Sequence, residues 1–215
     1  MHYNIINSGS DGNAVIINEN ILIDCGVPFK KLERYCKKIQ LVLLTHIHSD
    51  HFNKASIKKL IFERPTIRFG CGVWLVNQLL ELGVSKANID IYEMDKIYNY
   101  GNFKIIPFFL KHNVENCGYK IHLDNFKLFY ATDCNNLDGI VAKNYDLYMV
   151  EANYTEKGIK KRIQEKTEQG TFCYEYQVIK NHLSKEKADD FIYKNIGING
   201  QYIYMHINKE ENYES

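Results

Sequence analysis

The chain has 215 residues, of which 45% are hydrophobic and 25% are charged, and its formal net charge is +1. These values are typical of a globular domain with a sizeable core, so they exclude a disordered chain and give no general indication of a nucleic-acid partner. The N-terminus lacks the basic stretch and apolar run of a secretory signal, and no apolar run approaches the ~18 residues of a membrane span. We therefore expect a cytoplasmic protein without membrane association, whose six scattered cysteines are reduced.

The first quarter of the chain predicts short strands separated by turns. β-Branched runs at 3–9, 14–18 and 21–26 are punctuated by Ser, Gly, Asn and Asp. A helix is predicted at 28–39, because this segment begins with proline and repeats its apolar residues at helical spacing. The continuous apolar run at 41–45 then predicts a strand that is buried on both faces.

Helices and strands alternate in the next segment, and strands dominate again from about residue 103. We predict helices at 53–62 and 73–83 and strands at 66–71 and 89–93. Later strands are expected at 103–110, 116–123, 126–134, 145–153 and 202–208, and later helices at 156–168, 172–181 and 185–195. This order favours one layered domain over residues 1–215, with helices packed outside two sheets.

The segment "LLTHIHSDHF", residues 43–52, contains three histidines and an aspartate within six consecutive positions. His46 and His48 lie two residues apart on the extended exit of a strand, so their side chains can point to the same side and bind one ion. Asp50 and His51 lie where the chain turns into the next helix, where they can bind a second ion. Neutral imidazole is the commonest biological ligand of zinc, and a carboxylate compensates the charge of a divalent ion. The cluster therefore predicts a metal site rather than a polar surface turn.

Three further candidate ligands, His112, Asp133 and His206, each follow an apolar strand later in the chain. Taken singly, such residues are more often structural than functional. Together with the histidine cluster they predict one metal centre at the sheet edge where the loops gather. His2 and His122 have no comparable context and are not assigned to the site.

These motifs resemble the metallo-β-lactamase superfamily. "THIHSDH", "KHNVENCGY" with His112, "YATDC" with Asp133 and "YMHIN" with His206 agree with it in order and context, and "SGSDGNAVII" and "ILIDCG" are similar too. The resemblance implies an α/β fold, the αββα four-layer sandwich, with a two-metal site. It also implies that Asp24 is a buried aspartate that braces the histidine loop without binding metal.

The resemblance further implies two ligand sets and two divalent metal ions as cofactors. The first ion would be held by His46, His48 and His112, the second by Asp50, His51 and His206, and Asp133 would bridge them. Zinc is favoured by the histidine-rich set, with manganese and iron as alternatives. The ions would activate a bridging water near neutral pH and clamp the attacked phosphoryl group, and Asp50 would orient this nucleophile and accept its proton.

The C-terminal third resembles the nuclease and phosphodiesterase branch of the superfamily, including RNase Z-like and small bacterial exonuclease-like members. "VEANY", "NHLSKEKADDF" and "YMHIN" follow one another in the order of that branch. By this resemblance His182 stabilises the phosphoryl oxygens or protonates the leaving group, and Glu151 orients His182 through a hydrogen bond. The alternative for His182 is a structural residue before a helix that Ser184 caps.

We therefore expect a metal-dependent hydrolase, foremost a phosphodiesterase or nuclease acting on DNA, RNA or cyclic nucleotides. The alternatives are a hydrolase of another ester or amide, such as a thioester or lactam, and a non-catalytic metal-binding module. Tyr154 and Asn181 depart from the branch, in which histidine and glycine are frequent at these positions. The length of the chain also gives no room for the nucleic-acid-clamping domain or the protruding arm of related nucleases. We therefore expect short DNA, RNA or cyclic nucleotides, equally, before tRNA.

Two further features bear on the substrate. The basic segment 157–166 is either a solvated helix face or a track for a phosphate backbone. Tyr154, Tyr174 and Tyr176 are candidates for base stacking. A homodimer is expected by analogy with short members of such families.

Overall fold

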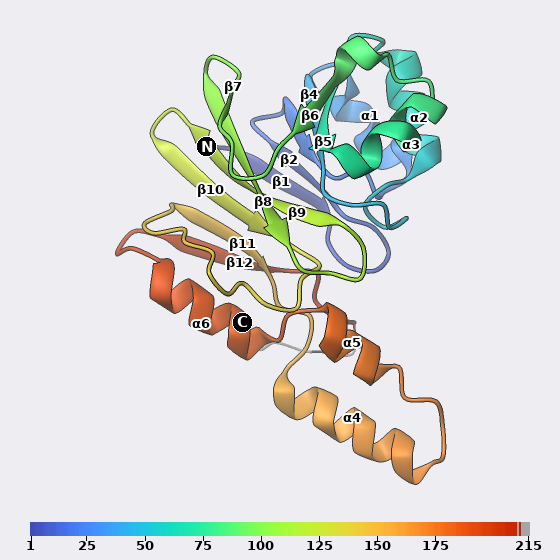
Figure 1. Cartoon of the computed structure of the whole chain (residues 1–215), viewed down its shortest axis with the longest axis vertical. Helices are drawn as coiled ribbons and strands as arrows, with labels where there is room; N and C mark the ends of the chain where they lie inside the picture. Colours follow the sequence, from blue (N-terminus) through green and yellow to red (C-terminus); the bar gives the residue numbers. More distant parts are fainter. Residues whose placement is uncertain (210, 212–215) are drawn as a thin grey trace. The chain divides into compact units, whose positions relative to one another are not determined.

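The computed structural model describes residues 1–209 and 211, which form two compact units, each built on one sheet (Figure 1). The first unit comprises residues 1–97 and 114–117, and the second comprises residues 98–113 and the described residues from 118 onward. The expected alternation of strands and helices is present. A single domain over the whole chain stays a prediction.

Six strands form the sheet of the first unit, in the order β1-β2-β3-β4-β5-β6. Their bounds are β1 Tyr3–Asn7, β2 Ala14–Ile17, β3 Ile21–Ile23, β4 Leu41–Leu44, β5 Arg68–Gly72 and β6 Ile89–Tyr92. The first three strands pair antiparallel, and β3 to β6 pair parallel. Every residue of β4 is buried, as predicted for a strand covered on both faces, so β4 is a rigid base for the histidines that follow it.

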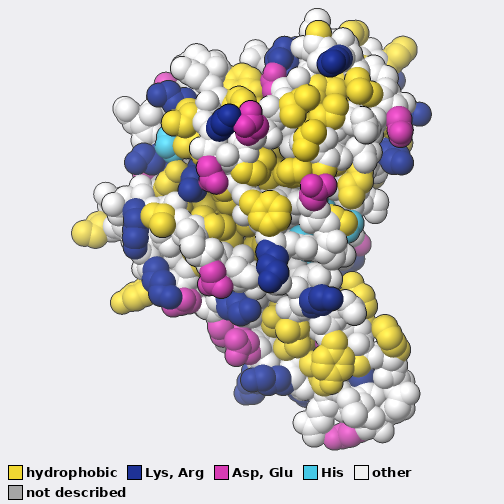
Figure 2. Space-filling model, viewed as in Figure 1, with side chains coloured by type: hydrophobic (Ala, Val, Ile, Leu, Met, Phe, Trp, Pro, Cys, Tyr) yellow, Lys and Arg dark blue, Asp and Glu magenta, His cyan; other side chains and the backbone are white. Residues whose placement is uncertain are grey.

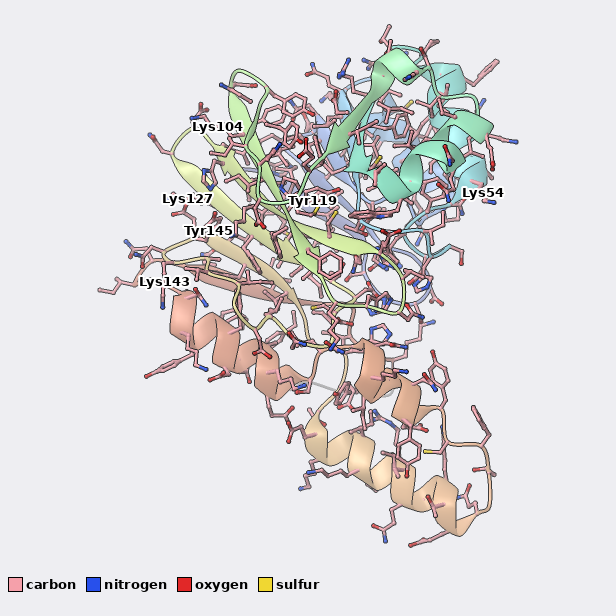
Figure 3. The ribbon with its side chains drawn as sticks, viewed as in Figure 1. Lys54, Lys104, Tyr119, Lys127, Lys143 and Tyr145 are labelled. Carbon is pink, nitrogen blue, oxygen red and sulfur yellow. The ribbon has the colours of Figure 1, made fainter. Side chains whose placement is uncertain are left out.

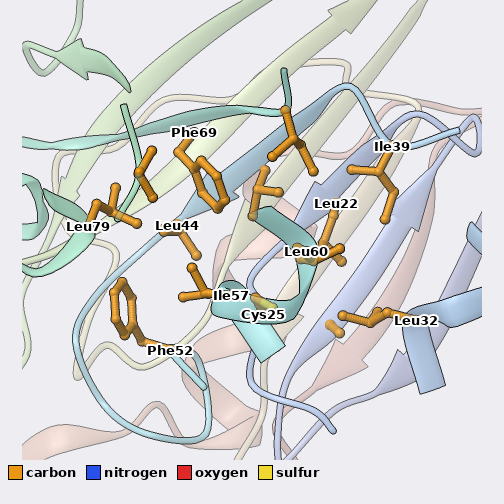
Figure 4. Close-up of a cluster of buried hydrophobic side chains, with 14 of the residues drawn as sticks. Leu22, Cys25, Leu32, Ile39, Leu44, Phe52, Ile57, Leu60, Phe69 and Leu79 are labelled. Carbon is orange, nitrogen blue, oxygen red and sulfur yellow. The ribbon is translucent and has the colours of Figure 1, made fainter. Parts of the chain in front are cut away.

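The helices of the first unit are α1 Phe29–Cys36, α2 Lys54–Glu63 and α3 Val76–Glu81, with 3₁₀ turns η1 Val73–Leu75 and η2 Lys86–Asn88. The helix predicted at 73–83 thus begins as a 3₁₀ turn. One hydrophobic core joins the inner faces of the helices to the sheet, with Leu32, Ile57 and Leu79 packed beside Leu22 and Phe69 (Figure 4). Burial of these apolar side chains is the main force that fixes the helices on the sheet.

The second sheet has the strand order β12-β11-β10-β9-β8-β7. Its strands are β7 Tyr98–Asn99, β8 Phe103–Leu110, β9 Asn116–Leu123, β10 Phe126–Ala131, β11 Leu147–Glu151 and β12 Gln201–Met205. β10, β11 and β12 pair parallel, so their carboxyl ends lie at one edge of this sheet. Asp133, Glu151 and His206 lie at or just beyond these ends, as the sequence predicts.

The helices of the second unit are α4 Glu156–Glu168, α5 Glu175–Asn181 and α6 Lys185–Asn195. α6 packs on the sheet through a core in which the rings of Phe191 and Phe129 lie 5.0 Å apart. Ser184 caps α6, because its hydroxyl accepts a hydrogen bond from the Lys187 amide. We call residues 156–181, which contain α4 and α5, the arm; Figure 1 shows it extending beyond the end of the sheet.

Two further expectations can be compared with the structure. The six cysteines, all of them described, form no disulfide, and five are buried. Among the helices of residues 1–209, none is long and apolar enough to cross a bilayer.

A close backbone approach fixes the loop after β4. A Cβ placed on Gly26 would lie 1.7 Å from the carbonyl oxygen of Asp50, so only glycine fits. The backbone of Asn13 links the segments that contain Gly26 and Asp50 by hydrogen bonds. Its carbonyl accepts from the Gly26 amide at 2.9 Å, and its amide donates to the Asp50 carbonyl at 2.6 Å. The residues next to Gly26 thereby set the path of the candidate metal-binding loop.

We predict that Gly26→Ala lowers the free energy of unfolding by at least ~3 kcal/mol, because backbone must move to admit the methyl group. Urea unfolding followed by circular dichroism measures this change. The matched control is Gly139→Ala, where the backbone has φ +77° and the space is open. That control should cost only about 1 kcal/mol, from the left-handed backbone alone. Equal losses in the two variants would contradict a steric role for Gly26.

A buried carboxylate joins the two helices of the arm. Glu175 is 5% exposed, and its Oε1 lies 2.6 Å from Lys166 Nζ and 4.0 Å from Arg162 Nε. Burial by itself raises the pKa of Glu175, but the hydrogen bonds from Lys166, the backbone and Cys173, together with the charge of Lys166, hold it below 4.5. The ionised form of Glu175 therefore stabilises the packing of α5 against α4.

We predict an acid-sensitive arm. Because the pKa of Glu175 is lowered by folding, its contribution is complete above the ordinary value of 4.5 and is lost as the pH falls through the lower folded value. Urea unfolding between about pH 6 and pH 3 should show a shallower pH dependence for Glu175→Gln than for the parent protein. Glu168→Gln, on an exposed position of α4, should leave the parent slope unchanged.

Candidate metal centre

The histidine loop follows β4 in the first unit and brings two imidazoles to one point. His46 Nε2 lies 3.1 Å from His48 Nδ1, and the two rings are nearly perpendicular, at 82°. A tetrahedral zinc ion with bonds of ~2.0–2.1 Å separates two ligand nitrogens by roughly 3.3 Å. The observed spacing therefore fits two ligands of one ion.

A buried carboxylate orients the rest of this loop. Asp24 Oδ1 accepts hydrogen bonds from the amide and the hydroxyl of Thr45, each at 2.9 Å, and Asp24 Oδ2 lies 2.7 Å from His51 Nδ1. The expectation that Asp24 braces the loop is confirmed. With its Nδ1–H donated to Asp24, His51 keeps Nε2 as the nitrogen that can bind a metal.

Asn13 is a supporting residue that the sequence analysis did not single out. Its Nδ2 lies 2.8 Å from His51 Nε2, and the Asp50 carboxylate is 3.6 Å from the same His51 nitrogen. Asn13 is fully buried, and its Oδ1 accepts from the Gly9 amide at 2.9 Å. The only sequence signal was a polar residue between Gly12 and the apolar run of β2.

The second unit holds a compact group of acids and imidazoles. One ligand atom from each of Asp133, Glu151, His182 and His206 lies within 4.8 Å of the others. Glu151 is fully buried, and its Oε1 is 2.6 Å from His182 Nδ1. Its other oxygen accepts from the amide of Cys134 at 2.9 Å. The predicted hydrogen bond between Glu151 and His182 is confirmed.

His206 lies between the two acids of this group. Its Nε2 is 3.6 Å from Asp133 Oδ1, and its Nδ1 is 3.4 Å from Glu151 Oε1. The Asn153 side chain, absent from the predicted site, lies 3.1 Å from His206 Nδ1 and donates to the His206 carbonyl at 2.8 Å. Asp133 and His206 both have positive φ, 57° and 50°, a backbone conformation that is uncommon outside glycine and often marks a functional residue.

His112 joins this group from the end of β8. Its Nδ1 lies 2.9 Å from the carbonyl oxygen of Asn181, and its ring centroid is 5.5 Å from that of His182. Burial lowers the pKa of His112 below 6.5, against the opposing charge of Asp133. His112 is thus kept neutral, with Nδ1–H donated to the carbonyl and Nε2 left to bind a metal.

The contact between His182 and Glu151 moves their two pKa values in opposite directions. Burial opposes charge on His182, but the neighbouring Glu151 carboxylate outweighs it and raises the pKa of His182 above 6.5. Burial likewise opposes ionisation of Glu151, yet the charge and hydrogen bond of His182 hold the pKa of Glu151 below 4.5. Each partner thus favours the charged form of the other, and their hydrogen bond holds the His182 ring in position.

The predicted site residues therefore gather within their own units. His46, His48, Asp50 and His51 lie together in the first unit, and His112, Asp133, Glu151, His182 and His206 lie together in the second. Their assignment to two ions stays a prediction. His122 is separate from the second group, with its Nε2 2.9 Å from the hydroxyl of Tyr145, which Figure 3 labels.

One substrate expectation needs correction. Tyr154 is only 3% exposed and packs with Ile159 and Val178 in the core of the arm, so it cannot stack a base. The error arises because the sequence does not show how the two helices of the arm pack. In the basic segment 157–166, Arg162 is ion-paired with Glu211 and Lys166 with Glu175, whereas Lys157, Lys160 and Lys161 are exposed, so both readings of this segment stay open.

Comparison with known proteins gives a family and a fold. The family model described as "Beta-lactamase superfamily domain" matches residues 19–175. Exodeoxyribonuclease YycJ of Bacillus anthracis is 23% identical over 169 residues, which cover 72% of this chain and 63% of that relative, less than two thirds of its length.

Solved structures are similar over nearly the whole chain. The metallo-β-lactamase fold protein YhfI from Bacillus subtilis has a TM-score of 0.73 and 18% identity, covering 96% of this chain and 86% of that chain. The short form of human tRNase Z has a TM-score of 0.70 and 16% identity, covering 97% and 93%. The predicted fold class, α/β of the metallo-β-lactamase type, is confirmed.

We predict that Asp24→Asn weakens metal binding by about 10–100-fold. An amide that donates to His51 Nδ1 would leave the hydrogen of the ring on Nε2, and this tautomer has no lone pair there for a metal. Competition with a chromophoric chelator measures the affinity, and circular dichroism shows whether the variant is folded. Asp138→Asn, an exposed change in the second unit, should keep the parent affinity. A folded Asp24→Asn protein with parent affinity would contradict the bracing role.

Proposed function

Because the chain belongs to the beta-lactamase superfamily, a family of hydrolases, we propose that it is a metal-dependent phosphodiesterase or nuclease. The observation that carries this proposal is the buried Glu151–His182 pair beside Asp133 and His206. Hydrolysis of a phosphodiester needs a proton donor for its strongly basic leaving oxygen, and His182, oriented by the Glu151 carboxylate, is our candidate for this role.

We further propose two divalent ions, with zinc favoured and manganese or iron as alternatives. The sequence assigns His46, His48 and His112 to one ion, Asp50, His51 and His206 to the other, and Asp133 to both. The donor chemistry of each unit supports this, since His46 and His48 already converge and the hydrogen bond of His51 Nδ1 to Asp24 puts the ring's lone pair on Nε2. When bound, such ions supply a water of pKa near ~7 and polarise a phosphoryl oxygen.

The side chains then perform the proton transfers. Asp50, whose carboxylate is 22% exposed, accepts a proton from the attacking water. As the new bond to phosphorus forms and the bond to the leaving oxygen breaks, His182 donates its proton to that oxygen. Glu151 keeps the His182 ring in place and stabilises its charged form.

A nucleic acid is the substrate class that we propose. The relatives' names, an exodeoxyribonuclease and a tRNase, describe enzymes that act on DNA and on tRNA. DNA and RNA are therefore placed before cyclic nucleotides for this chain. A cytoplasmic location and a homodimer stay predictions from the sequence.

The test compares the parent protein with Asp50→Ala, His182→Ala and the control His122→Ala, on bis-p-nitrophenyl phosphate and on a 5′-labelled DNA strand, with zinc or manganese supplied. Asp50→Ala should lower kcat on both substrates by about 10²–10⁴-fold. His182→Ala should lower kcat by a similar factor on DNA but by much less on the nitrophenyl ester, because nitrophenolate leaves without a proton. His122→Ala should match the parent.

Each other outcome has a distinct meaning. Cleavage of a thioester or lactam in place of any phosphodiester would overturn the substrate assignment and keep the hydrolase. Metal binding without any hydrolysis would indicate a binding module. Equal losses on DNA and the nitrophenyl ester in His182→Ala would assign His182 to the phosphoryl oxygens instead of the leaving group.

A further inference from the structure

The arm exposes large aromatic side chains that its own core does not use. Phe172 is 82% exposed, Tyr174 57% and Tyr176 59%, and Ile179 on the same helix as Tyr176 is 39% exposed. Figure 2 shows hydrophobic side chains gathered on the arm, with cationic side chains close to them. Apolar patches of this kind on a protein surface commonly mark an interaction site.

The packing of the arm does not account for these side chains. α4 and α5 are joined by a separate core of Tyr154, Ile159 and Val178, and by the buried ion pair of Glu175 with Lys166. The exposed rings are therefore hydrated at a cost in free energy, and they do not stabilise the arm. Because Glu175 is buried and ion-paired, its negative charge does not face a ligand on the outer surface of α5.

Lysines continue this surface toward the candidate catalytic group. Lys180 is exposed and lies four residues after Tyr176, so both side chains project from neighbouring positions on one face of α5. Asn135 links Lys180 to Lys111, because its side chain donates to the Lys180 carbonyl at 2.9 Å and its amide donates to the Lys111 carbonyl at 3.1 Å. Both lysines thus lie next to a candidate site histidine in the sequence, since His112 follows Lys111 and His182 is two residues beyond Lys180.

The distance along the chain between Tyr176 and His182 suits a short run of nucleotides. Tyr176 and His182 are six positions apart, which corresponds to about 9 Å along a helix. This is the length of roughly three stacked nucleotides at ~3.4 Å each. A strand whose bases stack at Tyr176 can therefore reach the Glu151–His182 pair with its backbone.

We propose that the outer face of α5 and the loop before it, residues 172–180, is a platform for an unpaired nucleic-acid strand. This inference rests on the proposed function and narrows its substrate to single-stranded DNA or RNA, or to the frayed end of a duplex. Bases stack on Phe172 and Tyr176, and Lys111 and Lys180 attract the phosphates. The exposed lysines beside these rings favour a polyanion, and aromatic side chains combined with cations are the arrangement that binds single-stranded nucleic acid.

The experiment uses the full chain and the double variant Phe172→Ser, Tyr176→Ser. The matched control is Tyr193→Ser, which removes a ring that is 85% exposed on α6 of the same unit. With a single-stranded oligonucleotide as substrate, the double variant should raise KM by about tenfold or more, while the control keeps the parent KM. On bis-p-nitrophenyl phosphate, which is too small to reach the platform, kcat/KM should be the same in all three proteins.

Fluorescence anisotropy with a labelled single strand separates the two proposals. If the parent hydrolyses no phosphodiester but the double variant still loses strand affinity, the proposed function fails and the platform stands. An unchanged KM and affinity in the double variant would overturn the platform. Light scattering gives a second contrary outcome. If the parent is a dimer and the double variant is a monomer, the platform is overturned, because this face then binds a second copy of the chain.

Discussion

Burial of a carboxylate beside an imidazole is the interaction on which the candidate site residues of each unit depend. Asp24, at the end of β3, is fully buried, and a lone buried charge would be strongly unfavourable. Its oxygens are satisfied by the backbone amide and hydroxyl of Thr45 and by His51. The loop must therefore keep the path that brings Thr45 and His51 to Asp24, and this path also sets the positions of His46 and His48.

The second unit also contains a buried carboxylate that is hydrogen-bonded to an imidazole, but the effect on the imidazole differs. Glu151, at the end of β11, accepts from the Cys134 amide and from His182, as Asp24 accepts from Thr45 and His51. In the first unit the bond fixes the tautomer of His51 whose Nε2 carries the lone pair. In the second unit the carboxylate raises the pKa of His182 above 6.5. In the function that we propose, one arrangement therefore serves ligand orientation in one place and acid catalysis in the other.

Much of this was predictable because the chemistry lies in short segments at strand ends. The apolar run of β4 and the spacing of its histidines predicted both the strand and the approach of His46 to His48, the apolar run before Asp133 predicted its place at a strand end, and the resemblance predicted the hydrogen bond of Glu151 to His182. Asn13 and Asn153 were not predictable, since their roles come from contacts with His51 and His206 that are distant in sequence. Tyr154 was misjudged for the same reason, because only the packing of α4 on α5 shows that it is buried.

The arm shows how a segment outside the histidine motifs can limit what a hydrolase accepts. Its stability comes from Tyr154, Val178 and the buried Glu175, so the rings of Phe172 and Tyr176 are free to vary without loss of the fold. The group that we assign to proton donation lies directly after α5, because His182 is the residue at which the helix ends. In our proposal, a substrate held on α5 is therefore presented to His182 by the helix itself. One continuous segment would then carry both specificity and catalysis, with its aromatic side chains facing solvent and its imidazole facing Glu151.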